Sequence, residues 1–266
     1  MNNLPVSDLE STRRREDMLR ELNIYPLWQR RAPLEGISAE RDLVEDAAVT
    51  EVIPVVAAPQ KEPKVAVDVS IMSWAALKKT VKNCSACSLR AGCLQTVFGS
   101  GDEHADWLFV GSWPTEDDES SGQPFSGAAG QLLDNMLAAI KLKRDARVYL
   151  TDVVKCSGSI TRGPQAAQIA QCAPYLARQI QLLKPKLIVV LGHSAATAML
   201  GEDREWSSLL GKMHEYKSVT ENGTSVTIPL IITHHPTALL LSPLNKAQTW
   251  RDLCLARDTM QELMQI

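Results

Sequence analysis

Four short apolar segments recur between residues 107 and 232, and each has the composition of a buried strand. They are Trp107–Val110, Val148–Thr151, Leu187–Leu191 and Val226–Ile232. Aliphatic, β-branched and aromatic residues dominate them, as in strands that are covered on both faces of a sheet. The pattern therefore predicts four strands of one central sheet.

Longer segments with helical periodicity separate these strands. The predicted helices are Ser73–Val81, Ala128–Leu142, Pro164–Leu183, Ser194–Leu200 and Lys246–Met264. Pro164 suits the first turn of its helix, because a proline there loses no hydrogen bond. Strands that alternate with helices indicate an α/β fold with a largely parallel sheet.

The first 70 residues lack this alternation and divide into two parts. Residues 1–31 carry six Arg and five acidic residues, whereas residues 32–70 carry three basic and eight acidic residues. The second part is rich in Ala, Val and Pro and has no helical period, which favours an acidic linker. We therefore expect an arm over 1–31, a linker over 32–70 and a folded domain over 71–266.

The arm combines apolar side chains with flanking arginines. After a short amphipathic helix pattern, its exposed candidates for partner binding are Leu22, Ile24, Leu27, Trp28, Arg30 and Arg31. A Trp with Leu neighbours and an Arg rim is the composition of an interface hot spot. Two interpretations follow, in which the arm binds another protein or packs on its own domain.

A chemically active loop follows each predicted strand. These loops are 111–127, 152–162, the one that begins Gly192-His193, and His234-His235-Pro236. In open α/β sheets the ligand crevice lies outside the carboxyl ends of the strands. We therefore expect all four loops to line one cleft.

Six cysteines offer a candidate metal site. Cys84 and Cys87 form a Cys-x-x-Cys pair, Cys156 follows a strand, and Cys172 falls within a predicted helix. Four thiolates from such separate elements suit either zinc or an iron–sulfur cluster. The alternative is a set of free buried cysteines. Cys93 and Cys254 are left over and are expected in the core.

Two side chains are candidates for contacts with a ligand. His235, fixed by Pro236, is placed to donate a hydrogen bond to a developing anion, or else it caps a helix. Phe125 lies in a Gly-rich loop, where it either stacks on a planar ligand or packs the loop. The loop lacks the Gly-Lys-Ser/Thr order of a P-loop, which excludes a nucleoside triphosphate site of that type.

From about Val81 to Leu253 the chain resembles the family 4 uracil-DNA glycosylases, the iron–sulfur branch of that superfamily. The matching segments are Cys84-x-x-Cys87, Phe109-Val110-Gly111 with Pro114, Gly122–Asp134, Tyr149–Cys156, Cys172–Leu176, Pro185–Gly192 and His235-Pro236. The resemblance implies a three-layer α/β fold and a 4Fe-4S cluster on Cys84, Cys87, Cys156 and Cys172. It also implies that Phe125 stacks on uracil and that His235 stabilises the uracil anion.

Three polar positions of this base pocket depart from the family pattern. Ser112 replaces an acid that positions water, and Trp113 adds bulk beside it at the cleft mouth, next to Gly111. Asp152 replaces the Asn that reads uracil, and an ionised Asp only accepts hydrogen bonds. Thr161 lies in a loop whose arginine and proline pattern has also changed. These departures predict weak or absent uracil excision.

The arm carries a second resemblance. Residues 14–36, including Arg30-Arg31 and Leu34-Glu35-Gly36, look like the start of the psi subunit of bacterial DNA polymerase III holoenzyme. The resemblance implies binding to the chi subunit and the clamp loader. We therefore expect a psi-like replisome accessory protein that also contacts single-stranded or damaged DNA. The alternative is an active DNA glycosylase that excises uracil or another damaged base.

Composition adds little to this picture. The net charge is −3, and hydrophobic residues make up 45% of the chain, as in ordinary globular proteins. No apolar run approaches the roughly 20 residues of a membrane span, and the N-terminus has no apolar signal sequence. These features predict a cytoplasmic protein that does not bind membranes.

Overall fold

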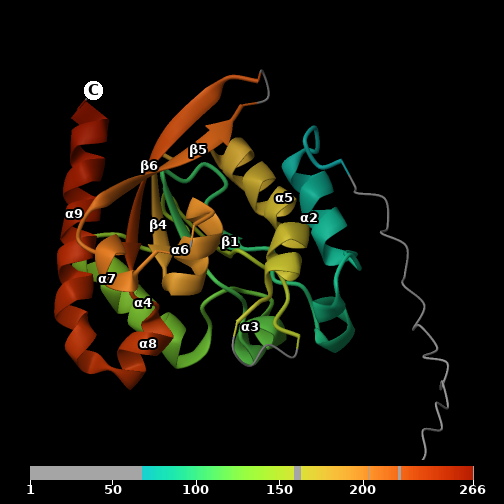
Figure 1. The fold of residues 1–266 in the computed structure, drawn as a ribbon, viewed down its shortest axis with the longest axis horizontal. Helices are drawn as coiled ribbons and strands as arrows, with labels where there is room; N and C mark the ends of the chain where they lie inside the picture. Colours follow the sequence, from blue (N-terminus) through green and yellow to red (C-terminus); the bar gives the residue numbers. More distant parts are fainter. Residues whose placement is uncertain (1–67, 159–162, 203, 221–222, 266) are drawn as a thin grey trace, which may run out of the picture. The chain divides into compact units, whose positions relative to one another are not determined.

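The sheet at the centre of the computed structural model has six strands in the order β1-β3-β2-β4-β6-β5 (Figure 1). The structure describes residues 68–158, 163–202, 204–220 and 223–265. The strands are β1 (Ser100–Gly101), β2 (Trp107–Gly111), β3 (Val148–Asp152), β4 (Leu187–Leu191), β5 (Met213–Val219) and β6 (Ser225–Thr233). The inner four run parallel, and the edge strands β1 and β5 run antiparallel to their neighbours.

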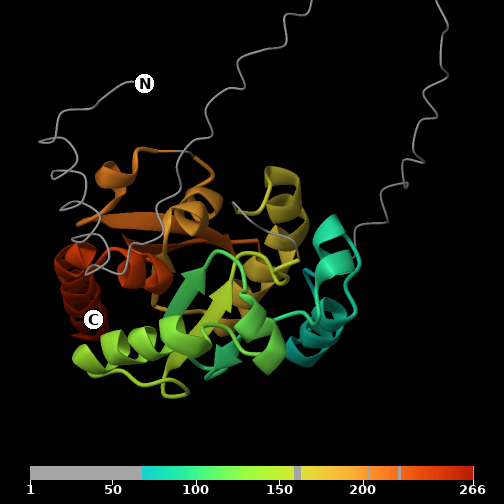
Figure 2. The same cartoon turned by 90° about the horizontal axis from the view of Figure 1, so that it is seen from below.

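Helices cover both faces of the sheet, as the turned view in Figure 2 shows. The α-helices are α2 (Trp74–Lys82), α3 (Glu116–Ser121), α4 (Gly127–Ala139), α5 (Ala166–Leu183), α6 (His193–Leu200), α7 (Trp206–Leu209), α8 (Pro236–Leu241) and α9 (Lys246–Gln265). Two 3-10 helices, η1 (Ser88–Gly92) and η2 (Pro243–Asn245), complete the elements of this part of the chain. The result is the expected three-layer α/β arrangement.

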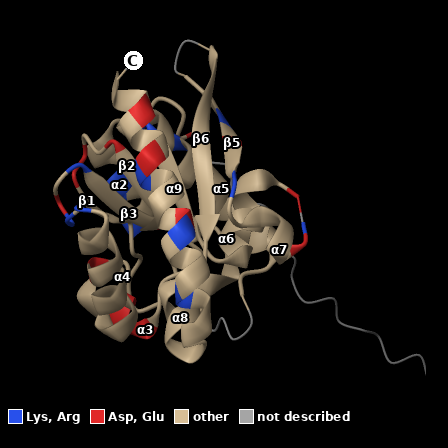
Figure 3. Cartoon of the chain, turned by 90° about the vertical axis from the view of Figure 1, so that its left-hand side faces the viewer, with Lys and Arg blue, Asp and Glu red and all other residues tan. Residues whose placement is uncertain are grey.

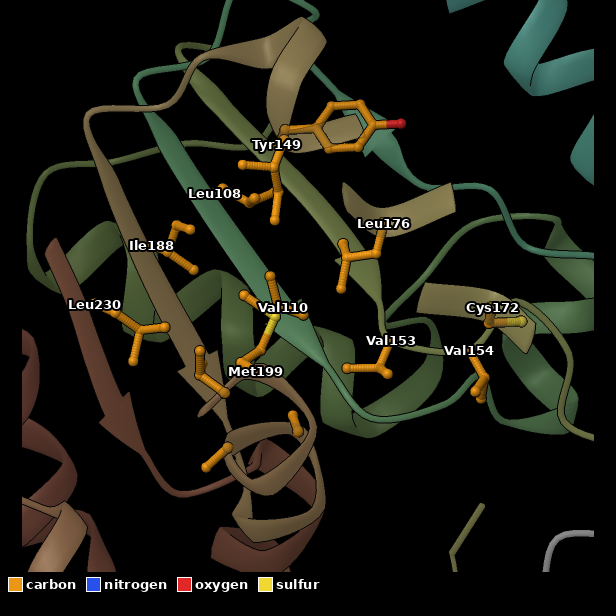
Figure 4. Packing of buried hydrophobic residues seen from close by; sticks show 14 of the residues in the cluster. Leu108, Val110, Tyr149, Val153, Val154, Cys172, Leu176, Ile188, Met199 and Leu230 are labelled. Atoms are coloured by element: carbon orange, nitrogen blue, oxygen red, sulfur yellow. The ribbon is translucent and has the colours of Figure 1, made fainter. Parts of the chain in front are cut away.

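Alternation along the buried strands divides the core into two layers. Leu108 and Val110 of β2 pack with residues of α5 and α6 on one face (Figure 4). Phe109, between them, packs with α4 and α9 on the other face. Successive side chains of a strand point to opposite faces, so one continuous apolar strand supplies both layers. This requirement explains why the central strands contain almost no polar residues.

A smaller cluster attaches α2 to the outside of α5. It contains Val69, Leu77, Val81, Phe98 and Tyr175. Val69 is buried, so the packed part of the chain extends at least to this residue.

The four predicted strands are confirmed, with boundaries that shift by no more than one residue. Sequence reasoning missed β1, which has only two residues, and β5, whose residues are mostly exposed. It also missed the short helices α3, α7 and α8, because one or two turns show little periodicity. The role given to Pro164 was wrong: Gln165 caps α5 and the helix begins at Ala166, so the proline precedes the first turn.

Several predictions fall on residues outside the described ones. They concern the arm over 1–31, the linker up to residue 67 and the loop position Thr161. Among the described helices, none is long and apolar enough to span a membrane.

Candidate base site

The sheet brings the predicted site residues together at the carboxyl ends of its parallel strands. Gly111 ends β2, Asp152 ends β3, and the two residues are partners in the strand pairing. His235 follows β6 by two residues, and a Cβ on Gly192, just after β4, would lie 3.2 Å from the His235 Cβ. The expected convergence of these loops is therefore confirmed.

Gly111 allows two side chains to close over the end of β2. A Cβ at this position would lie 2.2 Å from Asp152 Oδ1 and 2.7 Å from Phe125 Cζ. A larger residue at this position would therefore have to displace both side chains. The bare backbone of Gly111 thus forms a surface against which the Phe125 ring and the Asp152 carboxyl lie.

Phe125 occupies an unusual backbone conformation that its neighbours stabilise. Its φ is 55°, in the left-handed region that non-glycine residues seldom adopt. The Arg144 guanidinium donates to the Phe125 carbonyl at 2.8 Å and to the Pro124 carbonyl at 3.2 Å. The ring is buried in the core layer of α4. Sequence reasoning did not find Arg144, which lies 19 residues away in the chain.

His235 is both the N-cap of α8 and a neighbour of Phe125. Its Nδ1 accepts a hydrogen bond from the Thr237 N–H at 3.2 Å, which assigns the ring proton to Nε2. The two ring centroids are 5.6 Å apart. Although the side chain is partly exposed, burial of the ring lowers the pKa of His235 to about 4, against a smaller opposing effect of Asp118. The imidazole is therefore neutral near pH 7 and presents an N–H donor.

His234 packs inside the fold, away from the base-site role proposed for His235. It is buried and accepts a hydrogen bond from the Trp206 indole at 3.4 Å. Its other ring nitrogen is 3.3 Å from the Thr249 hydroxyl.

Asp152 is almost completely buried, and this changes its chemistry. Burial raises the pKa of Asp152 to about 7, while the Lys155 charge acts in the opposite direction. The Lys155 ammonium donates to the Asp152 backbone carbonyl and also to Thr151 and Gln179, at 2.6–2.7 Å. A carboxyl with this pKa exists in a protonated form that can donate as well as accept a hydrogen bond.

Ser112 and Trp113 line the next part of the loop after β2. Ser112 is buried, and its carbonyl accepts from the Val154 N–H at 3.2 Å. Trp113 is half-buried and packs on the core layer of α5. A hydroxyl thus occupies the place where the resemblance implies a carboxylate.

Asp118, which sequence reasoning did not single out, organises the Phe125 loop. Its carboxylate accepts from the Thr115 N–H at 2.7 Å and from the Ser126 N–H at 2.5 Å, which joins the N-caps of α3 and α4. Its charge also acts on His235 and Asp152. Figure 3 shows α3 as an acidic segment of the ribbon.

The four cysteines come from three parts of the chain around one edge of the core: the segment after α2, the loop after β3, and α5. Cys156 and Cys172 are buried in the α5 layer, Cys87 packs against it, and Cys84 accepts from the Tyr175 hydroxyl at 3.4 Å. Burial raises the pKa of the Cys156 and Cys172 thiols, and the other cysteines add to this effect. The thiols therefore lie close enough to one another for their charges to interact.

The four cysteines supply the donor type of an iron–sulfur cluster. Within the described residues, no three His, Cys, Asp or Glu side chains gather closely enough to hold one metal ion. A four-iron cluster holds its thiolates farther apart than one ion does, and four cysteines are its usual ligands. The residue types of Cys84, Cys87, Cys156 and Cys172 are thus compatible with an iron–sulfur cluster.

The two leftover cysteines differ from each other. Cys93 is buried, as expected, and its thiol donates to the Gln95 carbonyl at 3.1 Å. Cys254 on α9 is only half-buried, so its placement in the core was wrong.

Glu119, the neighbour of Asp118, serves the cysteine side of the molecule. Its carboxylate accepts from the Leu94 N–H at 2.9 Å and from the Ser157 N–H at 2.6 Å. Burial acts to raise its pKa, but interactions with Cys93, Ser157 and Leu94 together hold the pKa of Glu119 below its usual value. Consecutive residues of α3 thus stabilise the Phe125 loop and the loops around Cys156.

Comparison with known proteins shows which protein family the chain matches. A family model described as the uracil DNA glycosylase superfamily matches residues 98–256. The chain is 34% identical over 185 residues to a type-4 uracil-DNA glycosylase of Pyrobaculum aerophilum, which covers 67% of this chain and 90% of that protein. It is 37% identical over 169 residues to the type-4 enzyme of Archaeoglobus fulgidus, which covers 62% of this chain and 82% of that protein.

Proposed function

Because the chain belongs to the uracil-DNA glycosylase superfamily, we propose that residues 71–266 bind single-stranded or damaged DNA and hold one flipped base at the base site. Uracil excision at this site is weak or absent. The observation that carries this proposal is the arrangement of Phe125, Gly111, Asp152 and His235 at the ends of the strands.

The base-binding half of the site supports recognition of a planar base. The Phe125 ring supplies a face for stacking, and the Nε2–H of His235 supplies a donor for a base oxygen. In glycosidic hydrolysis, water attacks the sugar carbon and the bonding electron pair leaves with the base. A neutral imidazole donor stabilises that leaving anion without being consumed.

The water-activating half of the site is poorer. Ser112 offers a hydroxyl in place of a carboxylate, and a serine without a partner base does not take a proton from water. Loss of such acid–base assistance costs about 10²–10⁴-fold in rate. Asp152 lacks the permanent donor of an amide, because its carboxyl donates only when protonated.

The test is excision from an end-labelled oligonucleotide that contains one deoxyuridine, with the full-length chain and a type-4 relative side by side. We expect a rate at least about 100-fold below that of the relative. The double change Ser112→Glu and Asp152→Asn should raise the rate, and His235→Ala should remove what remains. Release by the unmodified chain at the relative's rate would refute this proposal and favour an active uracil-DNA glycosylase.

The four cysteines are proposed to hold a 4Fe-4S cluster, which would supply covalent ties between three separate parts of the fold. Cys156 and Cys172 join β3 to α5 in this arrangement, and Cys84 and Cys87 add the segment after α2. Iron and sulfide analysis after anaerobic purification tests this assignment. Absence of iron, or one equivalent of zinc, would contradict it.

For the arm we propose a psi-like accessory role in a cytoplasmic replisome, through the chi subunit and the clamp loader. Support comes from the sequence resemblance of residues 14–36, with Trp28 as the anchor and Arg30 and Arg31 at the rim. Residues 32–70 then act as a tether between arm and domain.

Trp28→Ala tests the accessory role with the full chain and purified chi subunit. We expect association to fall at least 30-fold, equivalent to about 2 kcal/mol, with no change in the melting temperature of the domain. Unchanged association together with a melting temperature several degrees lower would show instead that the arm packs on its own domain.

A further inference from the structure

We propose that a second site, a cationic groove beside β1, binds the sugar-phosphate backbone of single-stranded DNA. The groove has a volume of about 540 Å³ and lies between α2, η1, β1 and the turn that precedes Phe125. Its lining includes Trp74, Lys78, Lys82, Arg90, Ser100 and Gln123. None of the base-site residues lines it. The inference rests on the proposed DNA binding but not on any cleavage.

The charge of the groove favours a polyanion. Three cations and one acid, Glu103, line it. Lys78 and Lys82 are exposed and one turn apart on α2, and neither makes an ion pair with the described residues. Figure 3 shows the basic colour of α2 near β1. Unpaired lysines at a groove are available to replace the counterions of a phosphate chain.

Arg90 differs from the lysines because its position is fixed. Its guanidinium donates to the Cys93 carbonyl at 2.8 Å, which leaves further N–H groups for a ligand. A planar donor held in place suits phosphate recognition, because little side-chain entropy is lost on binding.

The floor of the groove suits sugars and bases. The half-buried Trp74 ring stands edge-on to Phe98 and to Tyr149, with centroid distances of 5.3 Å. β1 pairs with β3 on one side only, and a Cβ on Gly101 would lie 2.2 Å from the Val148 carbonyl oxygen. The edge therefore stays free of side chains at this residue. Basic groups combined with aromatic surface are typical of single-strand binding sites.

The position of the groove relates it to the base site. Gly122 and Gln123 line it, and Phe125 follows two residues later in the same turn. Asp118 bonds the Ser126 N–H, so this turn is held at its far end as well. The cationic groove lies on the other side of this turn from Phe125. A DNA strand that presents one base to Phe125 can therefore place its flanking phosphates in the groove.

The test measures binding of the full-length, iron-loaded chain to a fluorescein-labelled oligothymidylate of 15 nucleotides, which contains no uracil. Lys78→Glu/Lys82→Glu should weaken binding at least 10-fold. The milder Lys78→Gln/Lys82→Gln variant should reduce the slope of log K against log salt by about 1.4, or about 0.7 for each lost phosphate contact. Lys212→Glu/Lys217→Glu makes the same charge change at the other sheet edge and should alter binding less than 2-fold.

Several results would overturn the groove assignment. They are unchanged affinity of the Lys78/Lys82 variants at wild-type melting temperature, an equal loss in the Lys212/Lys217 control, or tighter binding of a duplex or an RNA of the same length. The outcome is separable from that of the proposed function. Binding of oligothymidylate requires no cleavage, so the groove assignment stands even if no uracil is ever released.

Discussion

The base site and the cysteine site come within five residues of each other on the chain, yet they are built in different ways. Asp152 ends β3 and belongs to the first, and Cys156 belongs to the second. The base site is closed by the protein alone, through the contacts of Gly111 and the hydrogen bonds of Asp118. The cysteines lie around one edge of the core without forming a closed group among the residues described.

This difference indicates which site would depend on the proposed cluster for its shape. Direct hydrogen bonds and packing give the base site its geometry before any ligand binds. Burial raises the pKa of the Cys156 and Cys172 thiols, which disfavours their thiolate forms when no cation lies beside them. Loss of the cofactor should therefore damage the cysteine side first and the base side only through the fold.

The largest expected effect comes from Cys172→Ala, which removes one proposed cluster ligand. Iron should be lost, and the free energy of unfolding should fall by about 4 kcal/mol or more, as in other cases of metal loss. Iron content and denaturant unfolding measure this. Cys254→Ala on α9 is the matched control and should retain iron. A Cys172→Ala variant with full iron would break the comparison.

The second prediction concerns Glu119, one of the two neighbouring buried carboxylates of α3. Glu119→Ala leaves the N–H groups of Leu94 and Ser157 without their acceptor, which should cost about 3 kcal/mol of stability. Its pKa is lowered in the fold, so this contribution is present at neutral pH and is lost as the pH falls through the folded pKa. The difference from wild type should therefore shrink in acid.

Urea unfolding at several pH values measures the Glu119 effect. Asp117→Ala, an exposed position on the same helix, serves as the control and should cost less than about 0.5 kcal/mol. A constant difference from pH 7 down to acid would show that the Glu119 charge is unimportant.

The third prediction concerns pH and the base site. Because burial raises the pKa of Asp152 to about 7, its carboxyl can donate to a base carbonyl below that pH and loses the proton above it. Affinity for an oligonucleotide with a non-cleavable 2′-fluoro deoxyuridine should then fall about 10-fold from pH 6 to pH 8, the equivalent of one hydrogen bond. Asp152→Asn should remove this dependence.

The control for the pH series is an oligonucleotide of the same length without uracil, measured in parallel by fluorescence anisotropy. A fall in affinity that is equal for both oligonucleotides would assign the pH effect to general electrostatics. His235 should not contribute, because its pKa of about 4 keeps it neutral over this range.

The smallest effect is expected at Cys93, which lies beside the cysteine site but outside the proposed ligand set. Cys93→Ala removes a buried thiol that donates to Gln95, and it should cost about 1 kcal/mol. Iron content should stay at one cluster per chain. Loss of iron in this variant would mean that Cys93 also supports the cluster, and it would contradict the proposed set of four ligands.

Much of the central sheet could be predicted from the sequence because its parallel strands are buried on both faces. Such strands appear as apolar runs, and their carboxyl ends are followed at once by the reactive residues. Asp152 and His235 were found in this way. Phe125 was found from its Gly-rich loop and from the family resemblance.

The supporting residues could not be predicted in the same way, because their partners are distant in the chain. Arg144 bonds a carbonyl 19 residues away, and Glu119 bonds an N–H 38 residues away. Asp118 and Glu119 form part of an acidic run that has the same composition as a solvated loop. Only the tertiary structure distinguishes these two buried carboxylates from their exposed neighbours.

The short β1 edge has a consequence for how copies of this protein meet one another. An exposed, flat edge strand is a template for strand addition and hence for aggregation. Here one edge has only two residues, and the other, β5, carries Glu215 and Lys217 among its exposed positions. Neither edge offers a long apolar strand to a second chain. We therefore expect the folded domain to stay free of edge-to-edge assembly at high concentration, which light scattering of the concentrated protein can check.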